Sequence, residues 1–212
     1  MLLEEIAVRL ERRILEPLPG PLAHEILRAV PVGKVVPSFE HKLPSKPGSV
    51  LILLYEENGN IRFPLIKRPE YTGAHSGQIS LPGGKAEGDE DPIQTALREG
   101  EEEIGIIGQE VKVLGRLTNF FVIPSNFMVT PVIGIIEGIP VFKPDPFEVS
   151  RIIHADVEAL LRSDAVLVKE ILAAGKYTMK APHFEIEGEV VWGATAMILN
   201  EFRMVVREVL EV

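Results

Sequence analysis

Short apolar runs alternate with amphipathic stretches along the chain, which predicts a mixture of strands and helices. Runs typical of strands occupy residues 49–55, 61–68, 111–117, 127–136 and 184–193. Helical periodicity covers residues 92–104, roughly 155–173, and 195–210. Between the first two strands lies Asn58-Gly59, a dipeptide that favours a two-residue hairpin turn. Because strands and helices interleave, the pattern predicts an α/β or α+β class with a mixed sheet.

The first twenty residues, "MLLEEIAVRLERRILEPLPG", alternate charged with apolar positions and predict an amphipathic helix. Its apolar positions are Leu2, Leu3, Ile6, Leu10 and Ile14. A secretory signal peptide would have a continuous apolar centre, and no run approaches the length of a membrane span. We expect the apolar face to pack on its own domain or on a second subunit, with binding at a membrane surface as the alternative.

The segment that follows, to about Gly48, is rich in proline and glycine and predicts irregular structure. No internal repeat and no long linker divides the sequence. A chain of 212 residues can hold one sizeable core or two small ones, and we predict a single domain over residues 1–212.

The composition narrows the possible ligands. A net charge of -9 argues against a surface for nucleic acid, because a phosphate backbone requires basic side chains. An anionic substrate would instead have to be bound by a few local Arg or Lys, or by cations. With no cysteine, any metal must be held by oxygen or histidine. The absence of cysteine fits a reducing compartment, and we expect a cytoplasmic protein.

Residues 92–104 carry clear signals for the two ends of a helix. Asp91 can cap the free amides at its start, and Pro92 suits the first helical position. Gln94 stands where a capping box requires it, and Gly105 can adopt the left-handed conformation that closes a helix. Gly100 falls near the middle of the apolar face, so the helix can lie close against the element that it covers.

Glu99, Glu102 and Glu103 share one stripe of this helix at about 100° per residue. Like charges spaced three or four residues apart destabilise a helix by about 0.2 to 0.5 kcal/mol per pair. Arg98 is placed to relieve the stripe. A solvated acidic face is the ordinary interpretation, but a divalent cation bound by carboxylate oxygens would turn the repulsion into attraction.

The sequence around the helix, "SLPGGKAEGDEDPIQTALREGEEEIGI", resembles the Nudix box. Its fixed positions match at Gly84, Glu90, Arg98, Glu99, Glu102, Glu103 and Gly105. The one departure is Gly100, where the pattern prefers a bulkier apolar residue. The resemblance implies an α/β/α sandwich with a mixed sheet and a loop-helix-loop. It also implies the hydrolysis of nucleoside diphosphates linked to another group, with Mg²⁺ or Mn²⁺.

Carried over by position, the resemblance identifies Glu99, Glu102 and Glu103 as metal ligands, with the Gly84 carbonyl as a further one. Arg98 resembles the residue that orients a ligand carboxylate. Glu90, the first glutamate of the box, is interpreted as a support for the loop. The alternative interpretation is a solvent-exposed side chain.

Hydrolysis also needs a general base that takes the proton of the attacking water. Clustered carboxylates raise one another's proton affinity, and we assign the base to Glu102. A Glu from a distant loop is the alternative, and the candidates are Glu137, Glu148 and Glu185.

Upstream, "LIKRPEYTGAHSGQISLPGG" is similar to the motif of the coenzyme A pyrophosphatase branch. It matches at Arg68, Gly77 and Pro82 to Gly84, and departs at Pro69, Gly73 and Leu81. Gly73 stands where a second Arg is expected, so one basic contact of that branch is missing. The likeness continues in "PDPFEVSRI" and "HFEIEGEVVWGATAMIL" and covers roughly residues 49–200.

Several other side chains are candidates for the substrate pocket. Arg68, His75 and Gln78 are assigned to contacts with substrate phosphates or to holding the loop, since an Arg can donate two hydrogen bonds to phosphate. Phe184 and Trp192 are expected in the core rather than as a platform that stacks on a base. Pro124-Ser125-Asn126 predicts a turn.

These observations predict a metal-dependent hydrolase that cleaves the pyrophosphate bond of coenzyme A or a related derivative. ADP-ribose or a dinucleoside polyphosphate is the alternative substrate. The alternative from another functional class is a Nudix-fold regulator without catalysis. Such a protein is expected to lack some of the ligand glutamates, whereas all three are present here. The expected partner is a small nucleotide, without nucleic acid or membrane, and the resemblance implies a possible homodimer.

Overall fold

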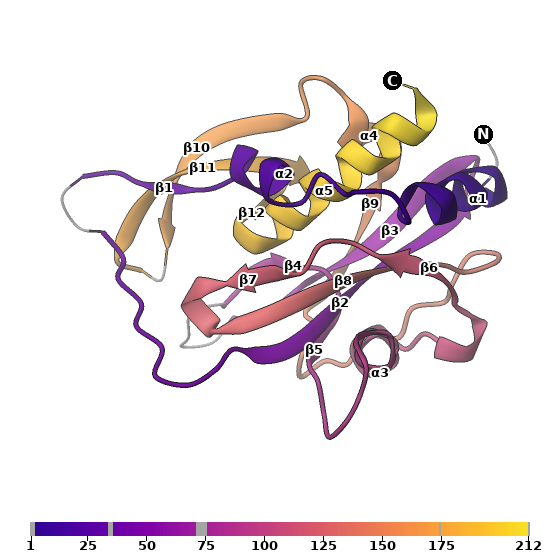
Figure 1. The fold of residues 1–212 in the computed structure, drawn as a ribbon, viewed down its shortest axis with the longest axis horizontal. Helices are drawn as coiled ribbons and strands as arrows, with labels where there is room; N and C mark the ends of the chain where they lie inside the picture. The colour runs from indigo at the N-terminus through magenta and orange to yellow at the C-terminus, as the bar shows by residue number, and fades with distance from the viewer. Residues whose placement is uncertain (1–2, 34–35, 71–75, 174, 212) are drawn as a thin grey trace.

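The structure is a computed structural model that describes residues 3–33, 36–70, 76–173 and 175–211. A mixed sheet forms its centre, with α3 (Pro92–Ile104) on one face (Figure 1). The opposite face carries α1 (Leu3–Arg13) and α5 (Gly193–Leu210) (Figure 1). The predicted α/β/α sandwich with a mixed sheet is therefore confirmed.

The central sheet contains eight strands, and a smaller sheet lies beside α5 (Figure 1). The central strands are β2 (Lys46–Glu57), β3 (Asn60–Lys67), β4 (Ile79–Ser80), β5 (Gly83–Lys85), β6 (Lys112–Arg116), β7 (Phe120–Val122), β8 (Phe127–Ile135) and β9 (Arg151–Asp156). The smaller sheet consists of β1 (Val30–Pro31), β10 (Val166–Ala173), β11 (Tyr177–Ile186) and β12 (Glu189–Trp192). Two short helices, α2 (Pro21–Ile26) and α4 (Val157–Leu161), and 3₁₀ turns at Gly108–Glu110 and Ile123–Ser125 complete the structure.

Strand β2 is buried on both faces because it lies at the centre of the sandwich. Leu51 and Leu53 point toward α3, whereas Ile52 and Leu54 point toward the core under α5. The strand pairs in parallel with β8, from Lys46 opposite Phe127 to Leu54 opposite Ile135, and antiparallel with β3 and β5. A strand enclosed in this way reads as a continuous apolar run, as observed in the sequence.

The hairpin predicted between β2 and β3 is confirmed. Asn58 and Gly59 form its two-residue loop and have φ angles of 53° and 79°. Positive φ at both loop residues matches the right-handed twist of the flanking strands, and Asn followed by Gly adopts it at low cost.

The amphipathic N-terminal helix packs on its own chain. This is one of the outcomes expected for its apolar face. Leu3, Ile6 and Leu10 are buried in the core that also contains Phe202 of α5. Leu2, which was included in the predicted face, lies outside the described residues. Within the described part of the chain, no helix is both long enough and apolar enough to cross a membrane.

The predicted helix over residues 155–173 is wrong for most of its length. Only Val157–Leu161 is helical, and it ends in a turn in which Ala165 N donates to Arg162 O. Residues 166–173 instead form β10, which pairs with β11 along its whole length. The run of Val, Leu and Ile suits a strand as well as a helix, and the partner strand decides between them.

Other boundaries also differ from the prediction. Strand β11 begins at Tyr177 rather than near residue 184, and it turns into β12 through Glu187-Gly188, both with positive φ. The segment expected to be irregular contains α2 and β1. Phe184 is in the core as expected, with 2% of its surface exposed, and the turn at 123–126 is confirmed.

Candidate active site

The helix α3 has the ends that the sequence predicts. The Asp91 carboxylate accepts hydrogen bonds from the amides of Ile93 and Gln94, and the Gln94 side chain accepts from the Asp91 amide at 2.9 Å. Gly105 closes the helix with a φ of 70°. These caps satisfy amides and carbonyls that a helix leaves without partners, so they fix where α3 begins and ends.

Gly100 holds α3 close to the sheet. A Cβ added to it would lie 2.9 Å from Ile106 Cδ1 and 3.1 Å from Leu51 Cδ2. A bulkier residue, which the Nudix box prefers here, therefore has no room in this packing. The expected close approach of the helix at Gly100 is confirmed.

The three carboxylates of the stripe differ sharply in exposure. The Glu103 side chain is 1% exposed and that of Glu99 13%, whereas Glu102 is 58% exposed. Glu101 points elsewhere and accepts a hydrogen bond from the Gly108 amide at 2.7 Å. Two acids of the stripe are thus buried against the loop before the helix, and the third faces solvent.

Arg98 connects three of the acids that surround it. Its Nε lies 2.7 Å from Glu90 Oε1, its Nη2 3.0 Å from Glu99 Oε1, and its Nη1 2.7 Å from Glu102 Oε2. Nη2 also donates to the Lys85 carbonyl at 2.9 Å. The predicted role of Arg98, to orient a neighbouring carboxylate, matches this geometry.

Glu90 belongs to the same network rather than to the solvent. Besides Arg98, its carboxylate accepts hydrogen bonds from the Glu87 amide and the Thr95 hydroxyl. The Arg98 hydrogen bond is the main reason why the pKa of Glu90 falls to about 2. The interpretation of Glu90 as a support for the loop is confirmed.

Glu103 is a buried acid with few compensating partners. Its Oε2 accepts from the Gly83 amide at 2.7 Å, and its Oε1 lies 3.8 Å from Arg68 Nη2. Burial raises the pKa of Glu103 to about 7, because desolvation disfavours the charged form more than these partners stabilise it. Burial also raises the pKa of Glu99.

One of the three distant acids lies near this pair. The negative charge of Glu148 contributes to the raised pKa of both Glu99 and Glu103. Glu148 lies in the exposed segment between β8 and β9. Glu185 is on β11 in the smaller sheet, and Glu137 follows β8, so the structure singles out Glu148 among these candidates.

Gly84 lies against the Glu99 carboxylate. A Cβ added to Gly84 would lie 2.5 to 2.6 Å from its three carboxyl atoms, so only glycine leaves the acid in place. The Gly84 carbonyl oxygen, in contrast, lies against Gly48 of β2, 2.6 Å from a Cβ built there. The role of this carbonyl as a metal ligand stays a prediction.

The donor set suits a hard divalent cation, since all three side chains supply oxygen from one turn of a helix. In the described residues, however, no three Asp, Glu or His side chains converge closely enough to hold an ion as they stand. Glu102 is turned toward Arg98, and Glu103 toward Gly83. Some rearrangement of these side chains is therefore needed before they can share one ion.

Two of the residues assigned to substrate phosphates lie together. The Arg68 amide donates to the Gln78 carbonyl at 3.0 Å, which places both beside β4 and β3. The Arg68 guanidinium faces Glu103 and is 31% exposed. His75 lies outside the described residues. The sequence did not reveal the Gly83 amide as a partner of Glu103, because that contact depends on how β5 folds back on β2.

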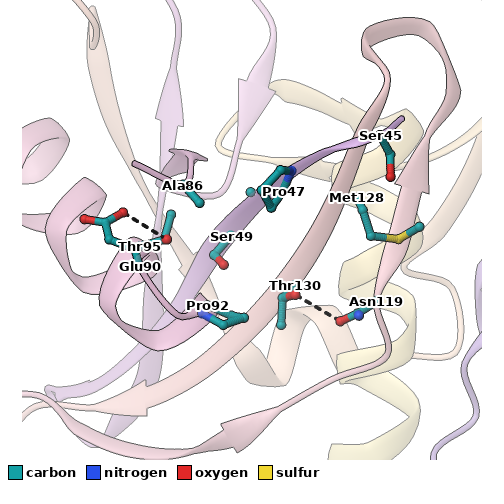
Figure 2. A pocket seen from close by; sticks show the side chains of 11 residues that line it. Ser45, Pro47, Ser49, Ala86, Glu90, Pro92, Thr95, Asn119, Met128 and Thr130 are labelled. Carbon is teal, nitrogen blue, oxygen red and sulfur yellow. Dashed lines mark hydrogen bonds between the residues drawn. The ribbon is translucent and has the colours of Figure 1, made fainter. Parts of the chain in front are cut away.

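A cavity of about 280 Å³ lies beside the N-terminus of α3 (Figure 2). Ser49 of β2 and Thr130 of β8 line it, and the Thr130 hydroxyl donates to the Asn119 side chain at 2.9 Å. Pro92, Thr95 and Glu90 also line it, and the Thr95 hydroxyl donates to the Glu90 carboxylate (Figure 2). No Arg or Lys lines this cavity among the described residues.

The acid stripe, the Arg98 network and the sandwich fold together define the class of this chain. A family model described as the NUDIX domain matches residues 45–166. The chain therefore belongs to the Nudix family.

Named relatives extend this result. The chain is similar to Nudix hydrolase 15, mitochondrial, of Arabidopsis thaliana, with 38% identity over 161 residues that cover 73% of this chain and 56% of that protein. It is also similar to the uncharacterized Nudix hydrolase NudL of Yersinia enterocolitica, with 33% identity over 64% of this chain and 69% of that protein. The matched part thus spans little more than half the length of the plant relative.

Among solved structures, the MutT protein of Methanosarcina mazei Go1 aligns with 81% of this chain and 97% of its own length. The TM-score is 0.49 and the sequence identity 19%. A likeness at this level gives no information on the substrate.

Proposed function

We propose that the protein hydrolyses the pyrophosphate bond of a nucleoside diphosphate derivative, with Mg²⁺ or Mn²⁺ bound by Glu99, Glu102 and Glu103. The observation that carries the proposal is the burial of Glu99 and Glu103 side by side, with the pKa of both raised. Two desolvated acids with so few partners are costly in the free protein, and a cation bound between them would offset that cost. Perturbed acids grouped in this way are typical of functional sites.

The bound cation would neutralise charge on the phosphate oxygens and acidify the attacking water. The side chains of the protein orient the ligands, bind phosphate and accept the proton. Arg98 holds Glu99 and Glu102 in orientation, and Arg68 is placed to donate to a phosphate beside Glu103. Glu102 accepts the proton from water as the water oxygen bonds to phosphorus and the bridging P–O bond breaks, so the products are two phosphate monoesters.

Coenzyme A is the substrate that we favour, and the motif around Arg68 and Pro82 to Gly84 supports it. Cleavage would then yield 3′,5′-ADP and a phosphopantetheine product. ADP-ribose or a dinucleoside polyphosphate is the second candidate, because Gly73 replaces an Arg that the coenzyme A motif contains. A regulator without catalysis fits less well, since the three carboxylates of the stripe are all present.

A substrate panel tests the proposal. Coenzyme A, ADP-ribose, NADH and diadenosine polyphosphates are incubated with Mg²⁺ or Mn²⁺, and the products are identified by mass. We expect coenzyme A cleavage that is lost in Glu102→Gln and Glu103→Gln and retained in Glu110→Gln, an exposed acid on the 3₁₀ turn after α3. If the wild type cleaves none of these substrates, the proposal is wrong.

The identity of the base is tested separately. With Glu102 as base, Glu148→Gln keeps the coenzyme A cleavage that Glu102→Gln loses. The opposite result would assign the base to Glu148, whose charge acts on Glu99 and Glu103.

A further inference from the structure

A second hollow lies at the start of β2, away from the acid stripe. Its volume is about 360 Å³, and we call it the basic hollow because His41, Lys42 and Lys46 line it. The other lining residues are Glu40, Leu43, Pro124, Ser125 and Asn126. It therefore gathers three basic side chains and one hydroxyl around a single acid.

Hydrogen bonds between residues 41–44 and residues 123–126 hold the basic hollow in place. Asn126 is 8% exposed and its Nδ2 donates to the carbonyls of Leu43 at 3.2 Å and Pro44 at 3.1 Å. The His41 ring nitrogen Nε2 lies 2.5 Å from the Ile123 carbonyl, to which it donates. The loop that carries the basic residues is thus fixed before any ligand arrives, which lowers the entropic cost of binding.

In the part of the chain that the structure describes, the lysines of the hollow form no close ion pair, although Glu40 lines the same hollow. Within the described residues, neither Lys42 nor Lys46 forms an ion pair, and Lys46 Nζ lies 5.5 Å from the centre of the Phe127 ring. Lys42, Lys46 and Ser125 line the same hollow in a chain with a net charge of -9. A phosphate monoester, with its double negative charge and several acceptor oxygens, matches this set of donors.

Strand β2 connects the basic hollow with the acid stripe. Lys46 precedes Ser49 by three residues on β2, a rise of about 10 Å. Ser49 pairs with Gly84, and Gly84 lies against Glu99. Coenzyme A carries its 3′-phosphate and its pyrophosphate on the same ribose ring, so one molecule that reaches both places has to bridge this separation.

We propose that the basic hollow binds a phosphate monoester of the substrate that lies apart from the scissile bond, such as the 3′-phosphate of coenzyme A. The choice of that substrate rests on the proposed function. The site would distinguish coenzyme A from ADP-ribose and the diadenosine polyphosphates, which lack this group.

Calorimetric binding of two products tests the site without catalysis. Adenosine 3′,5′-bisphosphate should bind the full chain about tenfold more tightly than AMP, as one charge-assisted contact predicts. The double variant Lys42→Gln, Lys46→Gln should bring the ratio near one. Glu40→Gln should raise the ratio, and Lys169→Gln, on exposed β10, should leave it unchanged.

An unchanged ratio in the double lysine variant would overturn the proposal. Inorganic phosphate that binds the basic hollow as tightly as the bisphosphate does would also overturn it, because the hollow would then be a site for free anions. Hydrolysis of coenzyme A and dephospho-coenzyme A is measured in parallel. If neither is cleaved, the proposed function fails, while the binding ratio still decides the role of the hollow.

Discussion

Arg98 holds Glu90 with two parallel hydrogen bonds, Nε to Oε1 at 2.7 Å and Nη2 to Oε2 at 3.1 Å. A planar guanidinium matches a carboxylate in this way, and a lysine does not. The bond joins the middle of α3 to the loop before it, so the position of Glu99 and Glu102 depends on it.

Arg98→Lys should therefore lower kcat at least tenfold, because the carboxylates lose their orientation although a positive charge remains. The melting temperature should also fall, since the loop is released from the helix. Steady-state kinetics and thermal melts measure the two effects. Arg12→Lys, a basic position in the last turn of α1, is the control and should change neither. Equal kcat in Arg98→Lys and wild type would contradict the role of the two parallel hydrogen bonds from Arg98 to Glu90.

The raised pKa of Glu103 predicts how the metal-free protein responds to pH. The folded value is about 7, against an ordinary value of 4.5, so the folded state binds the proton more tightly than the unfolded state. The stability that comes from this proton is complete below about pH 4.5 and is lost as the pH rises through about 7. Urea unfolding without metal, in wild type and in Glu103→Gln, should show this loss only in the wild type.

The same proton must leave when a cation binds. The affinity for Mn²⁺ should therefore rise by about tenfold per pH unit below pH 7 and level off above it. Calorimetric titration of the metal at several pH values measures this slope. A flat profile from pH 5.5 to pH 8 in the wild type would show that Glu103 is not protonated in the free site.

Gly100 is predicted to be required by packing rather than by chemistry. Gly100→Ala should lower the free energy of unfolding by about 1 to 3 kcal/mol, as overpacking in a core does. Ile106→Val removes Cδ1, the atom that an added Cβ approaches at 2.9 Å. The double variant should therefore lose less stability than the sum of the single variants. If the two losses of stability simply add in urea unfolding, the contact with Ile106 Cδ1 is not the cause of the loss in Gly100→Ala.

Glu201 is a buried acid that ties α5 to two other segments. It is fully buried and accepts hydrogen bonds from the Gly20 and Thr118 amides, and it lies 2.9 Å from His24 Nε2. Glu201→Ala should lower the free energy of unfolding by about 3 to 5 kcal/mol, because these polar partners stay buried without it.

The matched control is Glu208→Ala, which breaks the exposed ion pair with Arg13 and should cost about 1 kcal/mol or less. Both effects are measured by chemical unfolding. Similar losses in the two variants would contradict the importance of burial.

The sequence predicts those parts of the site that depend on neighbours along the chain. The caps of α3, the stripe of Glu99, Glu102 and Glu103, and the pairing with Arg98 all follow from helical spacing and local chemistry. The turn at Asn58-Gly59 follows from backbone preferences for the same reason.

Other features could not be predicted, because they depend on segments that meet only in the folded chain. The bond from the Gly83 amide to Glu103 requires β5 to return along β2, and the influence of Glu148 requires the segment after β8 to lie over the acids. The residues of β10 alone are compatible with a helix, and pairing with β11 makes them a strand.

The parallel pairing of β2 with β8 has a consequence for how the chain matures on the ribosome. Parallel neighbours need a long crossover, and the whole loop-helix-loop lies within the segment that joins these two strands. The group of strands against which α3 packs is therefore incomplete until residue 135 has left the exit tunnel. A nascent chain halted before that point should have no affinity for divalent cations, however complete its run of glutamates.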